Sequence, residues 1–366
     1  MVVTVKKITI AVAIYNVEKY LDACIKSIVC NLPDWAQVIL IDDASKDASG
    51  DICDKYVSDN ITVKHFEENC GVCAVRNYAI ENAQSEYICF VDGDDLIPPY
   101  FFDACEEVLA CGKDILFFSY GEFTNETEIE FDGGVSEEAN EITKDELTAM
   151  AQFVVASSSV LPRNPAYAPI RQTSIWAKAY KVQYLLDNDV RFPFDQKKSQ
   201  DLVFNSYAYF YASSAVFLNR KMYFYRQNPT SVCHRYNENI VDIAHKLLDN
   251  CKRAIDCLYD DEKMYELFLL YRVIMQLFTC MELDFFHKDN PKSPKERKME
   301  FENFCMQEPF KSAIAEYEKG IYWNERLLLL RLVRKNRFFA LDLLYRRPIL
   351  LKMYGKFCSL MQGGAK

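Results

Sequence analysis

Three carboxylates stand within four positions directly after an apolar run. The run covers residues 87–91, and Asp92, Gly93, Asp94 and Asp95 follow it. An apolar run bounded by polar residues predicts a buried strand, and glycine lets the chain turn sharply where that strand ends. Crowded carboxylates repel one another unless a cation or a donor-rich ligand neutralises them. Because Mg²⁺ takes one or two carboxylates together with substrate phosphates, the turn predicts a nucleotide-diphosphate site. A solvated acidic loop is the alternative.

The elements that must position this turn alternate between strand and helix. The expected strands are residues 8–14, 38–41, 61–66, 87–91 and 115–120, and the expected helices are residues 17–29, 49–57 and 72–83. Continuous apolar strands separated by helices predict an α/β fold, with a mainly parallel sheet covered by helices on both faces. Ligands of such sheets bind beyond the carboxyl ends of the strands. Tyr15, Asp43 and Asp92 follow three strand ends, which predicts a nucleotide crevice there.

Four segments in this order resemble the inverting family-2 glycosyltransferases with the GT-A fold. The segments are residues 11–16 (AVAIYN), 41–45 (IDDAS), 71–77 (GVCAVRN) and 87–95 (YICFVDGDD). A second block extends the likeness to about residue 235, through residues 175–178 (IWAK), 200–204 (QDLVF) and 223–226 (YFYR). The resemblance implies a GT-A type, Rossmann-like, mixed and mainly parallel sheet. It also implies the subgroup that builds bacterial capsular, exopolysaccharide or lipopolysaccharide chains.

The resemblance divides the chain into three parts. Residues 1–120 would be the nucleotide-sugar-binding half of a GT-A domain, and residues 121–240 its acceptor and catalytic-base half. Residues 241–366 read as a helical C-terminal region that is basic and amphipathic after residue 325.

The resemblance gives four residues to the nucleotide. Tyr15 would lie against the uracil face of a UDP-sugar, and the backbone near Ala13 would meet the base edge. Asp43 would accept the uracil N–H in a charge-assisted bond. Arg76 would hold the nucleotide side of the cleft, either by contacting Asp43 or by facing the phosphates. Core packing is the alternative for Tyr15, and a surface salt bridge is the alternative for Arg76.

The acidic turn would hold the rest of the donor. The resemblance implies that Asp92 bonds the ribose and that Asp94 ligates Mn²⁺ or Mg²⁺ bridging the diphosphate. The metal would act as a Lewis acid on the departing group. Asp95 would either orient the sugar or support the turn.

The resemblance places the catalytic base at Asp201. Inversion by single displacement needs a base on the acceptor side, opposite the departing diphosphate. Gln200 stands where relatives have glutamate, and an amide does not raise a neighbouring pKa by charge repulsion as a carboxylate would. The alternative for Asp201 is a helix N-terminal residue near a Ser199 cap.

Four further residues are weaker candidates for the diphosphate and acceptor. Arg226 suits a bidentate phosphate contact in a closing loop. His234 is either a further metal ligand or a solvated loop histidine. Trp176 and Lys178 would border the acceptor cleft, although tryptophan in a tyrosine-rich region is as often in the core.

Charge is unevenly distributed along the chain. Residues 241–366 carry 22 Lys and Arg against 18 Asp and Glu, a net of +4, which leaves −14 for residues 1–240 out of the total of −10. The acidic front portion argues against nucleic acid as a partner. Residues 326–366 hold ten basic side chains and the single acid Asp342, interleaved with apolar clusters. This pattern predicts peripheral contact with an anionic membrane, with a helix packed on the domain as the alternative.

The expected location is the cytoplasm, at the inner face of the cytoplasmic membrane. The fourteen cysteines are scattered and we see no secretory signal, which indicates reduced thiols. No uninterrupted apolar stretch approaches the ~18 residues of a spanning helix. The expected acceptor is a glycan or lipid-linked oligosaccharide, and the enzyme class is a hexosyltransferase-type glycosyltransferase.

Two other functions are weighed against this one. A nucleotidyltransferase of similar fold would want a glycine- and lysine-rich phosphate loop, which residues 13–16 lack. A non-catalytic sugar-nucleotide-binding scaffold would not need a base, so the presence of Asp92, Asp94 and Asp201 together argues against it.

Overall fold

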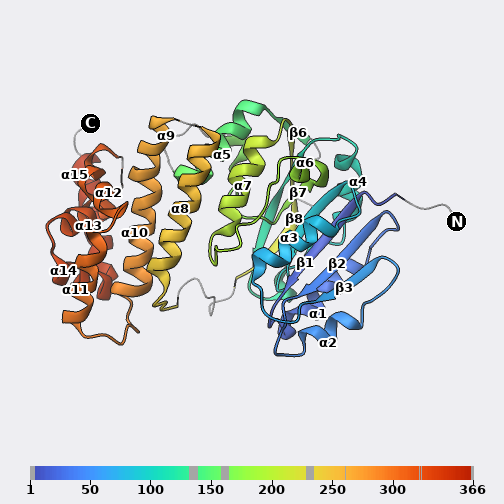
Figure 1. Cartoon of the computed structure of the whole chain (residues 1–366), viewed down its shortest axis with the longest axis horizontal. Helices are drawn as coiled ribbons and strands as arrows, with labels where there is room; N and C mark the ends of the chain where they lie inside the picture. The colour runs from blue at the N-terminus through green and yellow to red at the C-terminus, as the bar shows by residue number, and fades with distance from the viewer. Residues whose placement is uncertain are drawn as a thin grey trace. The chain divides into compact units, whose positions relative to one another are not determined.

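The computed structural model describes residues 5–131, 139–157, 165–227, 235–259, 261–320, 322 and 324–363, with the backbone alone at 324 and 357–363. The chain forms two compact units. The first comprises Met1–Val154 and Pro162–Pro229, and the second comprises Val155–Leu161 and Thr230–Lys366. Figure 1 shows the strands gathered in the first unit and helices α8 to α15 in the second.

The first unit is built on one eight-stranded sheet with the order β3-β2-β1-β4-β7-β5-β8-β6. Its strands are β1 (Ile8–Ile14), β2 (Ala36–Asp42), β3 (Ile61–His65), β4 (Tyr87–Asp92), β5 (Ile115–Phe123), β6 (Ala139–Ile142), β7 (Lys178–Lys181) and β8 (Ala215–Arg226). β1, β2, β3 and β4 pair in parallel, as do β5 and β8, whereas β6 and β7 run antiparallel to their neighbours. The predicted mixed, mainly parallel α/β sheet is confirmed.

The helices of this unit bury one apolar stripe each. α1 (Glu18–Val29) buries Leu21, Cys24, Ile25 and Ile28, the spacing of a helix with one face on a core. α1 packs with α2 (Ser49–Asp54), while α3 (Val72–Asn82) packs over β1 and β2 and against α6 (Val182–Asp187). The remaining helices are α4 (Phe101–Leu109), α5 (Lys144–Ala156), α7 (Gln200–Tyr211) and the short turns η1 (Glu126–Glu128) and η2 (Pro165–Tyr167).

Regular structure occurs on both sides of residues 132–138. β5 runs on to Phe123, and the edge strand β6 pairs antiparallel with β8. The β6 sequence Ala-Asn-Glu-Ile has little strand character. Its pairing is therefore decided by the neighbouring strand and not by local propensity.

The long strand β8 brings the acidic turn against the other half of the sheet. An isolated bridge joins Leu96, just after the turn, to Phe224 on β8. Leu96 and Phe224 are buried together with Phe123. As a result Asp94 and Asp95 lie beside the last residues of β8, more than a hundred positions away in sequence.

In the described residues of the second unit, all the regular secondary structure is helical. Its elements are α8 (Ile240–Leu258), α9 (Glu262–Leu267), η4 (Phe268–Val273), α10 (Ile274–Cys280), η5 (Met281–Phe285), α11 (Pro294–Cys305), α12 (Phe310–Glu316), η6 (Tyr317–Lys319), α13 (Asn324–Arg334), α14 (Phe338–Arg346) and α15 (Pro348–Gly363). The predicted C-terminal helical extension is confirmed. Among the described residues one stretch, Glu262–Phe285, is long and apolar enough to cross a membrane, and 67% of its most apolar window is buried inside the protein.

Candidate active site

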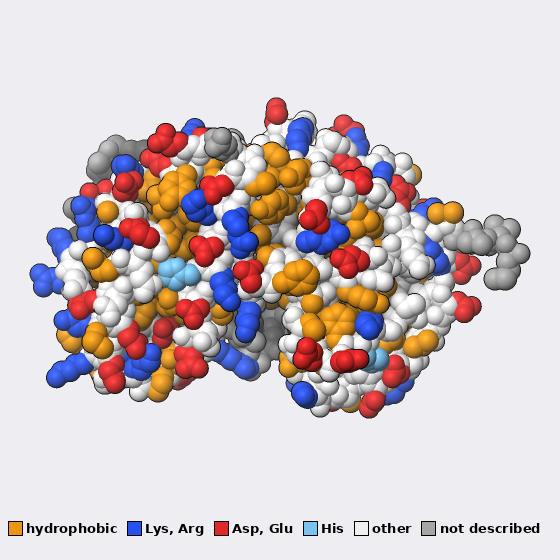
Figure 2. Space-filling view, in the orientation of Figure 1, with side chains coloured by type: hydrophobic (Ala, Val, Ile, Leu, Met, Phe, Trp, Pro, Cys, Tyr) orange, Lys and Arg blue, Asp and Glu red, His pale blue; other side chains and the backbone are white. Residues whose placement is uncertain are grey.

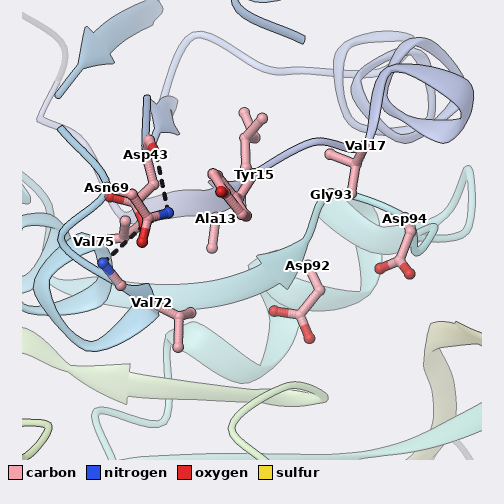
Figure 3. Close-up of a pocket in the computed structure, with 12 residues that line it drawn as sticks. Ala13, Tyr15, Val17, Asp43, Asn69, Val72, Val75, Asp92, Gly93 and Asp94 are labelled. Carbon is pink, nitrogen blue, oxygen red and sulfur yellow. Dashed lines mark hydrogen bonds between the residues drawn. The ribbon is translucent and has the colours of Figure 1, made fainter. Parts of the chain in front are cut away.

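A cavity of about 340 Å³ opens beyond the carboxyl ends of β1, β2 and β4 (Figure 3). Its lining consists of residues from these strand ends and from the start of α3, namely Ala13, Ile14, Tyr15, Val17, Asp43, Asn69, Gly71, Val72, Val75, Asp92, Gly93 and Asp94. The structure therefore gathers five predicted site residues around one cavity: Ala13, Tyr15, Asp43, Asp92 and Asp94.

The two loops after β1 and β2 are tied to each other at the mouth of this cavity. The backbone N–H of Asn16 donates to Ser45 Oγ, and the N–H of Lys46 donates to Asn16 Oδ1 at 2.7 Å. The preceding residue, Tyr15, is 45% exposed. It is thus a free aromatic surface at the cavity and not the core-packing residue that was the alternative.

Asp43 organises the loop that leads into α3. Its carboxylate accepts hydrogen bonds from Asn69 Nδ2 at 2.9 Å, from the Cys70 N–H at 2.7 Å and from the Gly71 N–H at 2.9 Å. Figure 3 marks the contact with Asn69. Gly71 has φ 85°, a conformation that favours glycine. Two carboxylate oxygens offer about four acceptor sites, so three donors leave room for one more.

Arg76 bridges two carboxylates deep in the site. Its Nη2 donates to Asp92 Oδ1 at 2.8 Å, and its Nη1 donates to Asp201 Oδ1. The expected contact of Arg76 with Asp43 is wrong, because the guanidinium is directed toward the end of β4 and the start of α7. Its side chain is only 4% exposed, so the surface salt bridge is excluded as well. Burial alone would lower the Arg76 pKa, but the charges of Asp201 and Asp92 outweigh it and raise the pKa.

Two carboxyl groups of the acidic turn, those of Asp94 and Asp95, have raised pKa values. Figure 3 shows Asp92 and Asp94 projecting to the same side from the end of β4. Burial and the charge of Asp92 raise the pKa of Asp94 to about 6. Burial and the charges of Asp92 and Asp94 raise the pKa of Asp95 to about 8. Crowding of like charges in a partly closed space is the condition that a bound cation relieves.

Asp95 supports the turn from below. It is 1% exposed and accepts hydrogen bonds from Tyr223 Oη at 2.5 Å and from the Arg226 N–H at 2.7 Å. These contacts agree with the expectation that Asp95 supports the turn. Its oxygens hold β8 against the turn and do not line the cavity.

Arg226 also holds the acidic turn. Its Nε donates to the Asp94 carbonyl at 2.7 Å and its Nη2 to Glu126 Oε1 at 2.6 Å. The side chain is 7% exposed, with its guanidinium over the rings of Tyr20 and Phe123. These protein acceptors engage two of the five guanidinium N–H donors, so the expected bidentate phosphate contact stays a prediction. The other predicted loop residue, His234, lies outside the described residues.

Asp201 lies at the start of α7, next to the half-buried Gln200 that opens the helix. Besides Arg76, its carboxylate accepts the Ile175 N–H at 3.1 Å. The preceding Ser199 has φ 62° and makes no side-chain cap. Burial raises the pKa of Asp201, although Arg76 opposes the rise. The side chain of Asp201 is 19% exposed, and both of its carboxylate oxygens accept hydrogen bonds from the protein.

Trp176 and Lys178 support the site from inside the fold. Trp176 stacks on Tyr223 with ring centroids 4.8 Å apart and on Tyr225 at 5.4 Å. Lys178 is 1% exposed, and its Nζ donates to the carbonyls of Ser174 and Trp176 among others. Burial lowers the Lys178 pKa to about 7. The expectation that Lys178 borders a cleft is wrong, because its ammonium holds the backbone that precedes β7.

Two residues of the site were missed from the sequence. Asn69 lines the cavity and donates a hydrogen bond to Asp43. It is a polar residue that follows the end of β3 by four positions, and the predicted site residues also lie at or after strand ends, so this position could have identified it. Tyr223 joins the Asp95 carboxylate to the Trp176 stack, and a hydroxyl inside an apolar strand gives no such signal.

The residues at the turn fit a metal only with help from a ligand. Among the described residues no three His, Cys, Asp or Glu side chains converge on one point. Asp92 and Asp94 could supply one or two oxygens, which is the usual protein share in a Mg²⁺–nucleotide site completed by phosphates.

Comparison with known proteins identifies the family. Residues 9–160 match Glycosyl transferase family 2. The putative glycosyltransferase EpsH of Bacillus subtilis is 25% identical over 94% of this chain and 97% of its own length. TarS of Staphylococcus aureus, a poly(ribitol-phosphate) beta-N-acetylglucosaminyltransferase, is 28% identical over 60% of this chain and 35% of its own length.

The fold is also found among solved structures. The crystal structure of S. aureus TarS 1-349 in complex with UDP-GlcNAc matches with a TM-score of 0.62 and 20% identity, over 93% of this chain and 92% of that one. Together with the strand-end cavity and its carboxylates, these similarities show that residues 9–160 form a glycosyltransferase family 2 domain and that the chain is a glycosyltransferase with the GT-A fold.

Proposed function

We propose that this enzyme transfers a sugar from a UDP-sugar, with inversion, to a hydroxyl of a growing polysaccharide. The observation that carries the proposal is the Arg76 bridge. It sets Asp92 of the donor cavity and Asp201 on the two sides of one guanidinium. Single displacement requires such a pair of sites, one for the departing diphosphate and one for the base that takes the acceptor proton.

The donor cavity supports a uridine nucleotide. Tyr15 offers an exposed ring at the cavity mouth, and Asp43 keeps an acceptor position that a ring N–H can fill. The bound nucleotide sugar named for the TarS structure is UDP-GlcNAc, and a cavity at the same strand ends of a shared fold is consistent with this donor class.

The diphosphate would lie against the acidic turn. Two carboxylates cannot hold a polyanion by themselves, so the proposal includes Mn²⁺ or Mg²⁺ with Asp94 as ligand and Asp92 beside it. When bound, the metal would neutralise charge on the leaving group. Asp95 and Arg226 keep the turn in place from beneath, so that Asp94 presents its oxygens to the cavity.

Asp201 would take the proton from the acceptor hydroxyl. Burial raises its pKa, and the charge of Arg76 opposes that rise. The Ile175 N–H donates to Oδ2 and Arg76 Nη1 donates to Oδ1, which together fix the orientation of the carboxylate. Gln200 adds no charge beside this base.

The acceptor would be a glycan, and we propose a lipid-linked oligosaccharide at the inner face of the cytoplasmic membrane. Relatives of the chain support a cell-surface polymer: TarS is a poly(ribitol-phosphate) beta-N-acetylglucosaminyltransferase, and TuaG of Bacillus subtilis is named a putative teichuronic acid biosynthesis glycosyltransferase. The donor sugar, within this class, is to be found by experiment.

The test is turnover of a panel of UDP-sugars with a lipid-linked oligosaccharide acceptor, with and without Mn²⁺. Release of UDP together with a lengthened glycan supports the proposal. Release of pyrophosphate from a nucleoside triphosphate and a sugar phosphate would show a nucleotidyltransferase. Tight UDP binding without turnover of any donor and acceptor pair would show a binding scaffold.

A further inference from the structure

The basic C-terminal helices do not all face the same surroundings. α13 packs into the second unit, because Leu329, Leu330 and Val333 are at most 6% exposed. α14 is anchored by Phe338 and Leu341, which are 1% and 0% exposed. The rest of α14 and the start of α15 leave five large apolar side chains at the surface. They are Phe339 (61% exposed), Leu343 (49%), Ile349 (66%), Leu350 (37%) and Met353 (62%).

Basic side chains surround these apolar residues. Arg337, Arg346, Arg347, Lys352 and Lys356 are all exposed. Figure 2 shows lysine and arginine side chains along the C-terminal helices with hydrophobic ones between them. The surface formed by residues 337–356 is called the α14–α15 face below.

The single acid of this segment does not offset the charge. The Asp342 carboxylate accepts hydrogen bonds from Arg297 Nη1 and Arg346 Nε, both at 2.8 Å, and its side chain is 15% exposed. Arg297 is itself buried, so Asp342 serves as its counter-ion. Four exposed cations of the face are therefore left for an external partner: Arg337, Arg347, Lys352 and Lys356.

A cavity of about 420 Å³ opens beside the junction of α14 and α15. Leu329, Leu344 and Leu351 contribute to its apolar lining, and its ionisable lining residues are Glu282, His287, Lys288 and Arg346. A mainly apolar hollow with two basic side chains and one carboxylate in its lining can take the hydrocarbon chain of an amphiphile with an anionic head.

We propose that the α14–α15 face is a docking surface for an anionic phospholipid bilayer. Ile349, Leu350 and Met353 enter the headgroup and acyl boundary, while Arg347, Lys352 and Lys356 lie at the level of the phosphates. Charge complementarity selects this occupant. An isologous contact with a second copy would bring the same cations face to face. The inference deepens the proposed membrane location, but it does not depend on which sugar is transferred.

The experiment is co-sedimentation of the full-length protein with phosphatidylcholine vesicles, with and without phosphatidylglycerol. We expect binding that rises with the phosphatidylglycerol content and falls as sodium chloride screens the charges. The charge variant combines Arg347→Gln, Lys352→Gln and Lys356→Gln, which leaves the Asp342 pairs intact. It should bind anionic vesicles at least roughly tenfold more weakly.

A matched control removes the same charge from exposed lysines of the first unit, by Lys19→Gln, Lys26→Gln and Lys55→Gln. This control should bind vesicles as the wild type does. Equal loss in both variants would show a general effect of net charge and would overturn the assigned face. UDP affinity, measured in the same preparations, should be unchanged in the charge variant, so that failure of the face is distinguishable from failure of the donor site.

A second variant tests insertion of the apolar side chains into the bilayer separately from electrostatic attraction to it. Ile349→Ser with Leu350→Ser and Met353→Ser should weaken binding even in low salt, where charge alone acts at its strongest. The opposite outcome is a wild-type protein that does not bind anionic vesicles but forms multimers, as measured by light scattering. If the triple serine variant no longer forms these multimers, the face joins copies of the chain and does not bind a membrane.

Discussion

The carboxylates of Asp92 and Asp201 share the guanidinium of Arg76. Asp92 ends strand β4 at the donor cavity, and Asp201 begins helix α7 more than a hundred residues later. A planar guanidinium holds two carboxylates at a set distance, because its donors point in fixed directions. The relation between the donor cavity and the candidate base is thus set by one buried side chain.

The first prediction concerns Asp201 as the base. Asp201→Asn keeps the shape but cannot take a proton, so turnover should fall roughly 10²–10⁴-fold. UDP affinity should barely change, because in the proposed site Asp43, Asp92 and the metal would hold the nucleotide. The measurements are glycosyl transfer and UDP binding by the same protein, with Gln200→Ala as the milder neighbouring control. Near-normal turnover of Asp201→Asn would move the search for a base to other acids such as Asp195.

The second prediction concerns Arg76 and pH. Arg76 lowers the pKa of Asp201 while burial raises it, so Arg76→Gln should raise that pKa further. The base must be deprotonated, and the acidic limb of the rate–pH profile should therefore move to higher pH. Removing one partner of a buried ion pair typically costs about 3–5 kcal/mol of unfolding free energy, so thermal stability should fall too.

Arg191→Gln serves as the control for that experiment. Arg191 is 24% exposed and its contact with Glu81, at 3.6 Å, lies away from the two site carboxylates. It should shift neither the profile nor the stability by a comparable amount. A lower rate with an unmoved acidic limb would show that Arg76 acts on folding alone.

The third prediction concerns the metal at Asp94. UDP should bind more tightly with Mn²⁺ or Mg²⁺, and Asp94→Ala should remove that dependence. Because the Asp94 pKa is raised to about 6, protons compete with the metal below this pH. The metal-dependent gain in UDP affinity should therefore be present above pH 6 and be lost as the pH falls through it. Calorimetry on both sides of this value measures the gain, and metal-independent affinity of the wild type would contradict the assignment.

The fourth prediction concerns which nucleotide base, uracil or cytosine, the cavity recognises. If Asp43 accepts the uracil N–H beside Tyr15, UDP should bind well and CDP poorly, since cytosine lacks that donor. A lost partner for a buried polar group costs about 1–3 kcal/mol. Asn69→Ala is the informative companion, because it removes one donor to Asp43 without removing the carboxylate. It should weaken both nucleotides less than Asp43→Ala does, and equal affinity of the wild type for UDP and CDP would count against Asp43 in this role.

Much of the first unit could be predicted from local pattern. Apolar runs place β1, β2 and β4 and their polar ends, since burial of a whole strand leaves a continuous apolar signature. Parallel strands bring their carboxyl ends to one edge, so Tyr15, Asp43 and Asp92 were expected together and are found around one cavity. The roles given to these residues stay predictions until the experiments above are done.

Contacts between distant segments were decided by the tertiary structure. Arg76 contacts Asp201, and Arg226 holds the acidic turn, because the order of strands in the sheet brings these segments together. Lys178 has the type of a cleft residue but is buried among carbonyls. Residue type and periodicity determine which elements form and which ends are polar. Which charges meet, and which cations stay free for a partner, depends on packing over long sequence separations that no local pattern records.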